Sequence, residues 1–455
     1  MNKRHSAVFQ FAFAFAVGVF LLSPKPAAGD DWPTYRHDQR RSGVSDERLR
    51  FPLKQAWVRR SPTAPQTAWT GPAKWDAWAG NAGLQSMRNF DPCFFVTATG
   101  NQVFFGSSID DAVNALDAGT GKENWVHFTG SAVRFPPTLA NGNAWFGSDD
   151  GFVYCCDQRS GELAWKRAAF QQDHRITSNR KIMSLWPVRT GVLLDGDKVI
   201  FAGSLVPWEK SYLWKIDAET GRDDTNGCFQ KSVDGVTLQG AMLSSTKRLY
   251  IPQGRAAPLA FGVTDGKFVG AIGEAGGVFC VLTEDEMLLA GPQDQKSPTD
   301  QIRVADATNR KRVATFAGAN RVLVQGKQAW VPANDQLRAL DRTAYVAADT
   351  MIAQTSELLK AKKIEAAEAK RKIDAAKKAK ANAWRWSVSC PNPSGFIKAG
   401  NMVMVGLSDE VRVFNASTGK LAWSTKVDGV VYGLAVANGR LFVSTGLGHI
   451  YAFAP

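Results

Sequence analysis

Arginine and tryptophan side chains gather in two segments that lie between predicted strands. Arg134 belongs to the short stretch VRFPP, and Arg180, Trp186 and Arg189 belong to the stretch RKIMSLWPVR. Guanidinium groups bind carboxylates and phosphates through paired hydrogen bonds, and they stack on aromatic faces. These four residues are therefore our candidate binding site for an anionic ligand. The alternative is that the arginines tie loops to backbone carbonyl groups.

Residue types that carry catalysis form no recognisable pattern. The sequence contains neither a Gly-x-Ser-x-Gly elbow nor a His-Glu-x-x-His motif. The acidic pairs Asp149-Asp150 and Asp195/Asp197 adjoin glycines at expected turns, and turn chemistry explains them without a metal. The histidines beyond the N-terminus are scattered, at His37, His127, His174 and His449. We therefore predict no catalytic residues and no metal site.

One repeated unit must position the candidate residues. Its clearest copies begin at Val103, Ala144 and Val403. Each has a short apolar strand, a turn rich in Gly, Ser and Asp, and an alternating strand that ends in Asp or Asn. A tight turn with Gly and a strand that carries Trp follow. With the apolar run before each copy, the unit is a four-stranded antiparallel meander.

The number of units predicts the architecture. Weaker copies of the skeleton are centred on four aspartates, Asp217, Asp265, Asp306 and Asp341. A last copy stops at Pro455 after its third strand, which would leave an unpaired edge. LKQAWVR, at 53–59, resembles the missing strand. We therefore predict an all-β, eight-bladed β-propeller over 30–455 whose ring is closed by the N-terminal strand.

Large side chains recur in register with this unit. Tryptophans occupy one position of the fourth strand in five copies, as Trp57, Trp125, Trp165, Trp386 and Trp423. Because a wide aromatic ring buries much apolar area, we expect these residues to pack between blades.

Two sequence blocks carry a resemblance to a known family. They are DDWPTYRHDQRRSG, at 30–43, and RKIMSLWPVRTG, at 180–191. With the repeats, they make the chain similar to the pyrroloquinoline-quinone-like (PQQ-like) β-propellers, especially exported bacterial members. The resemblance covers nearly all of the chain after its N-terminus and implies the fold. Relatives include quinone-dependent alcohol dehydrogenases and a non-enzymatic outer-membrane assembly lipoprotein, so the activity stays open.

Two functions follow from the resemblance. The first is a non-catalytic exported propeller that binds or scaffolds partners through its loop-rich inter-blade face. The second is a PQQ-dependent oxidoreductase acting on alcohols or sugars, with the planar cofactor in the channel and a calcium held by oxygen ligands. No segment matches that family's calcium ligands or catalytic Asp. We favour the first function and expect no cofactor, with PQQ and calcium as the alternative.

The adjacent cysteines bear on this choice. The quinone-dependent relatives carry an adjacent-Cys disulfide against the cofactor. Here Cys155 and Cys156 replace Ala115 and Leu116 of the first copy. Successive residues of a strand point to opposite faces. We therefore expect both cysteines to be core residues.

The N-terminus has the pattern of an export signal. Lys3 and Arg4 precede an apolar run at 7–22 and small residues at 27–29. We predict a cleavable signal peptide at 1–29 and a periplasmic or secreted protein, with an uncleaved anchor helix as the alternative. No Cys lies near the cleavage site, so no lipid anchor is expected, and no other segment is long and apolar enough to cross a membrane.

The net charge is +13. For an exported chain this excess favours anionic lipids, cell-envelope polymers or anionic small molecules as partners over nucleic acid. A protein partner is expected from the binding or scaffolding function. Solvated surface charge without a partner is the alternative.

One insertion interrupts the sixth blade. Residues 345–383 are rich in Ala, Lys and Glu and contain no Gly or Pro, a composition typical of helix. We expect Asp349 to cap its start. The flanking strands are neighbours, so the chain must return, as a helical hairpin or as a helix with an extended return. The insertion is either a docking or dimerisation arm or a solvated excursion.

Overall fold

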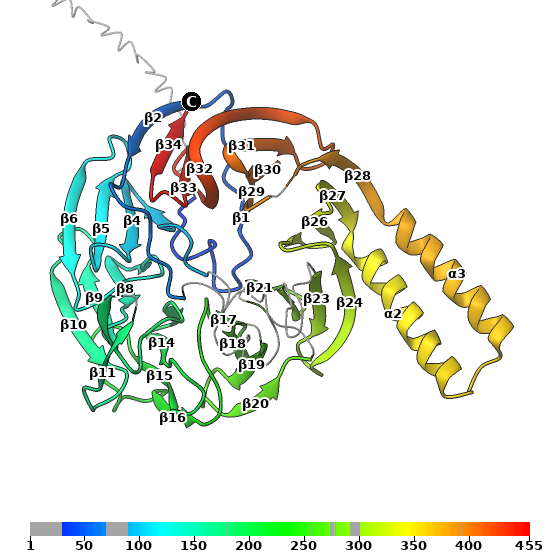
Figure 1. Ribbon diagram of the computed structural model, residues 1–455, viewed down its shortest axis with the longest axis horizontal. Helices are drawn as coiled ribbons and strands as arrows, with labels where there is room; N and C mark the ends of the chain where they lie inside the picture. The colour runs from blue at the N-terminus through cyan, green and yellow to red at the C-terminus, as the bar shows by residue number, and fades with distance from the viewer. Residues whose placement is uncertain are drawn as a thin grey trace, which may run out of the picture.

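A ring of short strands makes up most of the computed structural model, which describes residues 30–69, 90–178, 180–254, 256–273, 277, 279–291, 301–391 and 393–455. The sheets follow one another around a centre, with the fourth strand of each sheet at the outer rim (Figure 1). The predicted signal peptide, 1–29, lies outside the described residues.

Six sheets of four antiparallel strands follow one another in the described part of the chain. The first three consist of β3 (Val96–Thr99), β4 (Gln102–Ser107), β5 (Ala112–Asp117) and β6 (Glu123–Phe128); β7 (Thr138–Ala140), β8 (Asn143–Gly147), β9 (Phe152–Asp157) and β10 (Leu163–Ala168); and β13 (Leu193–Asp195), β14 (Lys198–Gly203), β15 (Ser211–Asp217) and β16 (Phe229–Val233). The next three consist of β17 (Leu243–Ser244), β18 (Arg248–Gln253), β19 (Ala256–Gly262) and β20 (Phe268–Ala271); β21 (Phe279–Leu282), β22 (Met287–Gly291), β23 (Gln301–Asp306) and β24 (Lys311–Ala317); and β25 (Leu323–Gln325), β26 (Gln328–Ala333), β27 (Gln336–Asp341) and β28 (Trp384–Ser389). A two-stranded ribbon, β11 (Arg175–Ser178) and β12 (Lys181–Ser184), precedes the third sheet.

The last sheet closes the ring. It contains β1 (Val44–Ser45), β29 (Gly395–Ala399), β30 (Met402–Gly406), β31 (Ser408–Asn415), β32 (Leu421–Ala437), β33 (Arg440–Thr445), β34 (Ile450–Ala454) and β2 (Lys54–Arg59). β2 pairs antiparallel with β34, with Trp57 opposite Ala452. The prediction of a propeller closed by the N-terminal strand is confirmed. The long strand β32 joins two meanders into one sheet, and the count of eight blades stays a prediction.

The N-terminal segment crosses the middle of the ring (Figure 1). We call residues 30–45 the plug segment. Its main chain hydrogen-bonds, at 2.8 to 3.0 Å, to the first strands of five sheets: Trp32 to Ala98, Pro33 to Leu139, Gln39 to Ser244, Arg40 to Leu282 and Gly43 to Lys398. The first strands are the innermost ones, and the plug segment therefore links sheets that are far apart in the sequence.

The five fourth-strand tryptophans each contact the next unit around the propeller, as predicted. Trp125 Nε1 donates to the Gln158 carbonyl of the following sheet at 3.1 Å. The indole of Trp125 covers Gly161, where an added Cβ atom would lie 2.6 Å from the indole. The other four make equivalent bonds: Trp57 to Ala118, Trp165 to Ala218, Trp386 to Ala416 and Trp423 to Leu53. Gly121, Gly221 and Gly419 lie in the same way under Trp57, Trp165 and Trp386, so these tight turns need a glycine to receive the tryptophan of the neighbouring unit.

The hydrophobic core lies between neighbouring sheets. Cys155 packs with the core on the side of the third sheet, beside Phe201. Cys156 packs with the core on the side of the first sheet, beside Phe104. Both are free thiols, and burial raises the pKa of each to about 12. The prediction that these cysteines are core residues on opposite faces is confirmed.

A helical hairpin leaves the sixth four-stranded sheet between β27 and β28. It consists of α2 (Arg342–Lys360) and α3 (Ala366–Asn382), and it projects away from the ring (Figure 1). The expected cap at Asp349 is wrong. The cap is Asp341, whose Oδ1 accepts from Ala344 N at 3.0 Å, because the helix starts directly at the end of the strand. Within the described residues, no helix combines the length and apolar character needed to span a bilayer.

Candidate functional site

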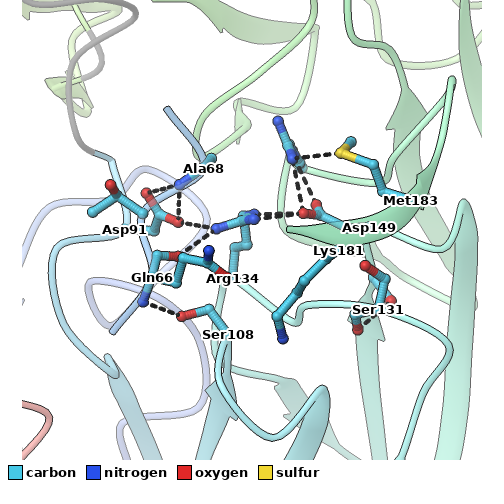
Figure 2. Close-up of polar contacts among 12 residues, drawn as sticks. Gln66, Ala68, Asp91, Ser108, Ser131, Arg134, Asp149, Lys181 and Met183 are labelled. Carbon is cyan, nitrogen blue, oxygen red and sulfur yellow. Dashed lines mark hydrogen bonds and ion pairs between the residues drawn. The ribbon is translucent and has the colours of Figure 1, made fainter. Parts of the chain in front are cut away.

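Four buried charged residues meet where connections between the first three sheets converge. Arg134 lies between β6 and β7, and Arg189 lies between β12 and β13. Asp149 is in the turn between β8 and β9, and Asp91 precedes β3. Figure 2 shows Arg134 between the two carboxylates. We call these four residues the Asp149 clamp.

Hydrogen bonds within the clamp are short and charge-assisted. Asp149 accepts from Arg189 Nε at 2.6 Å and Nη2 at 2.8 Å, one bond to each oxygen. It also accepts from Arg134 Nε at 2.7 Å. Arg134 Nη1 donates to Asp91 at 2.6 Å. Each of the four side chains is at most 4% exposed, so water screens these bonds little.

The clamp also holds the backbone around it (Figure 2). Asp91 accepts from the Ala68 amide at 2.9 Å, and Arg134 Nη1 donates to the Gln66 carbonyl at 2.9 Å. The segment before β3 is thereby joined to the connections on both sides of the second sheet. The arginines are therefore ties between loops, with carboxylates as their main partners.

Protonation within the clamp reflects burial and charge together. Burial alone would raise the pKa of Asp149, but Arg134 and Arg189 lower it to about 2. Burial would lower the pKa of Arg134, but Asp149 and Asp91 raise it. For Asp91 burial dominates, and its pKa is raised although Arg134 acts in the opposite direction. Asp149 is therefore the carboxylate of the clamp whose ionised form the folded state favours.

The other two predicted site residues lie outside the clamp. Trp186 is buried, and its Nε1 donates to the Lys210 carbonyl at 2.8 Å. Arg180 is exposed, in the turn between β11 and β12, with a φ of 65°. The structure brings Arg134 and Arg189 together and leaves Arg180 and Trp186 apart from them. An anion would have to compete with carboxylates for both clamp arginines, and its binding there stays a prediction.

Trp186 instead forms part of an aromatic pocket. Its ring centroid lies 4.1 Å from that of Phe170 and 5.8 Å from that of His174. The pocket, of about 430 Å³, also includes Tyr212 and Trp208. Trp208 is 67% exposed, in the connection between β14 and β15. We call these five aromatic residues the Trp186 pocket.

Both sites lie at one edge of the sheets. In an antiparallel meander, the turn between the second and third strands lies at the same edge as the connection to the next sheet. Asp149 and Trp208 occupy such turns, and Arg134 and Arg189 occupy connections between sheets. The inter-blade face thus has a rigid, buried ionic tie and an open aromatic pocket.

A narrow cavity lies at the centre of the ring, against the plug segment. Its volume is about 60 Å³. Tyr35 and Arg36 of the plug segment line it together with Phe279 and Arg321. Arg36 lies over the Phe279 ring, 5.0 Å from its centroid, and burial lowers its pKa to about 10. The described lining is mostly aromatic and aliphatic, with two arginines.

PQQ and calcium do not fit the described part of this cavity. Pockets for ligands of this size measure roughly 300 Å³ or more, well above the volume found. Calcium needs several oxygen ligands, whereas the described lining has two arginines and no carboxylate. Elsewhere in the described residues, no group of three or more His, Cys, Asp or Glu side chains is arranged to hold a metal ion.

Sequence reasoning found the clamp arginines but missed their partners. Asp149 was attributed to turn chemistry, and Asp91 and Trp208 were not singled out. Each lies in an irregular connection, where no periodic pattern marks burial or exposure. The available signal was an arginine within an apolar connection, Arg134, together with an acidic turn at Asp149.

The sheets, their tryptophan contacts and the closing strand define a repeat β-propeller of the PQQ-like class. A family model described as outer membrane protein assembly factor BamB matches residues 68–227, 109–271 and 369–455, more than half of the chain. The chain belongs to this family. No curated protein sequence matches it.

Solved structures share the fold at low identity. BamB from Moraxella catarrhalis is 13% identical, with a TM-score of 0.53, over 89% of this chain and 100% of that one. The quinohemoprotein alcohol dehydrogenase ADHIIG from Pseudomonas putida HK5 is 11% identical, with a TM-score of 0.58, over 93% and 80%. The quinohemoprotein alcohol dehydrogenase from Comamonas testosteroni is 15% identical, with a TM-score of 0.57, over 93% and 80%. At these identities the likeness shows the fold alone.

Proposed function

We propose that the protein is a non-catalytic propeller of the bacterial envelope that binds a protein partner through its inter-blade face. The Trp186 pocket carries this proposal. Exposed tryptophans beside a pocket are typical of binding hot spots, and Trp208 is 67% exposed on this face. The Asp149 clamp holds the neighbouring connections rigid, which reduces the entropy lost on binding.

The nature of the partner is inferred from the family. The family model is described as an outer membrane protein assembly factor, and on that likeness we infer that the partner is another envelope protein. Export rests on the N-terminal pattern of the sequence. In cell fractionation the protein should be periplasmic or secreted, and its mature N-terminus should lie at or next to Asp30.

A pair of matched variants tests the binding face. Trp208→Ala removes the exposed ring, and Leu421→Ala removes a side chain that is 56% exposed at the opposite edge of a sheet. A partner captured from an envelope extract should be purified and titrated against both. We expect Trp208→Ala to weaken its binding at least tenfold, since hot-spot truncation costs about 2 kcal/mol or more. Equal affinity for both variants would contradict the proposal.

The oxidoreductase alternative has its own test. The purified chain is incubated with PQQ and calcium and supplied with alcohols or sugars and a redox dye. We expect no dye reduction above that of the free cofactor. Saturable, substrate-dependent reduction would overturn the non-catalytic assignment.

A further inference from the structure

The helical hairpin is a stiff arm whose base alone is attached to the ring. At the base, Tyr345 Oη donates to the Thr315 carbonyl at 3.1 Å. Asp349 accepts from the Thr315 amide at 2.9 Å and from Lys380 at 2.5 Å. Among the described residues, the hydrogen bonds and ion pairs of 351–379 stay within the hairpin.

Small buried residues hold the two helices together. Ala348 and Thr355 of α2 are buried, as are Ala369 and Ala376 of α3. Such residues let helix backbones approach closely, so the arm is stiff without adding to the core of the ring. Its distal half presents its remaining side chains to the surroundings.

Those side chains are strongly basic. Between 360 and 380 there are eight lysines and one arginine against three acidic residues. Four exposed cations lie on one face of α3, at the helical spacing i, i+1, i+7 and i+8: Lys370, Arg371, Lys377 and Lys378. None of these four forms an ion pair with a described residue. Asp374, at i+4, is exposed on the same face, so the face presents a net charge of +3 to an external anionic surface.

Exposed leucines accompany the charge at the tip. Leu358 is 42% and Leu359 is 39% exposed, at the end of α2. Lys360, Lys362 and Lys363 follow directly and are exposed. Leucines flanked by lysines, at the end of a stiff arm, match the composition of segments that lie in a membrane interface.

The excess of lysine over arginine in the hairpin favours a bilayer over a protein as its partner. Specific protein interfaces are enriched in Arg and depleted in Lys, because Arg makes fixed paired hydrogen bonds whereas Lys acts as a hydrated point charge. Eight lysines and one arginine therefore suit a diffuse anionic surface. We propose that the tip of the hairpin binds the surface of an anionic phospholipid bilayer, with Leu358 and Leu359 entering the interface. This surface is distinct from the inter-blade face.

Vesicle flotation with the full chain tests the proposal. We expect binding to vesicles of mixed phosphatidylglycerol and phosphatidylcholine, weak binding to phosphatidylcholine alone, and release by high salt, because salt screens the attraction. Lys362→Glu with Lys363→Glu should lower the partition coefficient at least tenfold, since each basic residue near an anionic surface contributes about fivefold. Leu358→Ser with Leu359→Ser should lower it severalfold.

The ring offers a matched control for both variants. Lys420 and Leu421 are an adjacent, exposed Lys–Leu pair on the ring. Lys420→Glu with Leu421→Ser should leave vesicle binding unchanged. Failure of the unmodified chain to bind mixed vesicles, or equal binding by hairpin and control variants, overturns the proposal. Binding to polyglutamate without binding to vesicles also overturns it and identifies an acidic polypeptide as the partner. Trp208→Ala should leave vesicle binding intact, which separates this result from the test of the inter-blade face.

Discussion

Replacing Asp149 by Asn tests whether the Asp149 clamp holds the inter-blade connections. The shape of the side chain is kept, but two buried guanidinium groups, of Arg134 and Arg189, lose their shared carboxylate. Removing one partner of a buried ion pair costs roughly 3–5 kcal/mol. The lowered pKa of Asp149, about 2 against an ordinary value of 3.8, corresponds to about 2–3 kcal/mol for the ionised form alone. We therefore expect a loss of about 3–5 kcal/mol in the free energy of unfolding.

Asp91→Asn is the matched control. Burial raises the pKa of Asp91, so its charge contributes less than that of Asp149, and Arg134 keeps its bond to Asp149. Denaturant titration at neutral pH, followed by tryptophan fluorescence, should show a smaller loss for Asp91→Asn than for Asp149→Asn. A loss of less than about 1 kcal/mol in the free energy of unfolding for Asp149→Asn would refute the reasoning, because leaving a buried charge without its partner destabilises a protein by more than that.

The same clamp predicts a pH dependence. The folded state lowers the pKa of Asp149 to about 2, so it favours the ionised carboxylate. The resulting stability is fully present above the unfolded value, near 4, and is lost as the pH falls toward about 2. The difference in unfolding free energy between the unmodified chain and Asp149→Asn should therefore be constant above pH about 5 and shrink below pH about 4. A constant difference down to pH about 2 would contradict this assignment.

Three further predictions concern the ring and the hairpin. Gly161→Ala places a Cβ 2.6 Å from a neighbouring tryptophan ring at a φ of 75°, and should lower the free energy of unfolding by at least about 2 kcal/mol. The control Gly142→Ala, at a φ of 78° with open space around it, should lower it by about 1 kcal/mol, the backbone contribution alone. Denaturant midpoints compare the two variants. Tyr345→Ala should lower the free energy of unfolding by about 3–5 kcal/mol, because the tyrosine side chain is buried against the core. Replacing 352–375 by a short linker should leave the melting temperature nearly unchanged. Equal effects of the two changes would contradict the conclusion that the hairpin is attached only at its base. A chain that begins at Ser61 lacks the plug segment and β2, so it should aggregate or lose cooperative melting, and unchanged melting would sink the closure argument.

Local patterns in the sequence were sufficient for the repeat architecture. Six of the sheets in the described residues pair strands that are consecutive in the chain, and five tryptophans each donate to a carbonyl of the next unit in the ring. Alternation, turn glycines and the position of Trp125 or Trp165 therefore carry the information directly. The closing strand β2 pairs with β34, far away in the sequence, and was predictable because Trp57 repeats the signature of the missing strand.

The helical hairpin was predictable only in part. Composition indicated helix, and the proximity of the flanking strands required a return. The first turn was misplaced, because Asp341 ends β27 and caps α2 at once. Asp349, the expected cap, is instead bonded to Thr315 and Lys380. Which residue caps the helix depends on where the chain leaves the strand, and the pairing of β27 in its sheet fixes that point.

Only the tertiary structure decided what fills the centre of the ring and what the conspicuous arginines do. The plug segment has almost no regular secondary structure, and its partners are distributed over five sheets, so no periodic pattern announces it. Arg134 and Arg189 were recognisable as candidates. Whether such a side chain faces a ligand or a buried carboxylate depends on which connections meet at the inter-blade face. Asp149 meets both arginines because the turn between β8 and β9 lies at the same edge of the sheets as the connections that hold Arg134 and Arg189. This arrangement is set by the packing of neighbouring sheets.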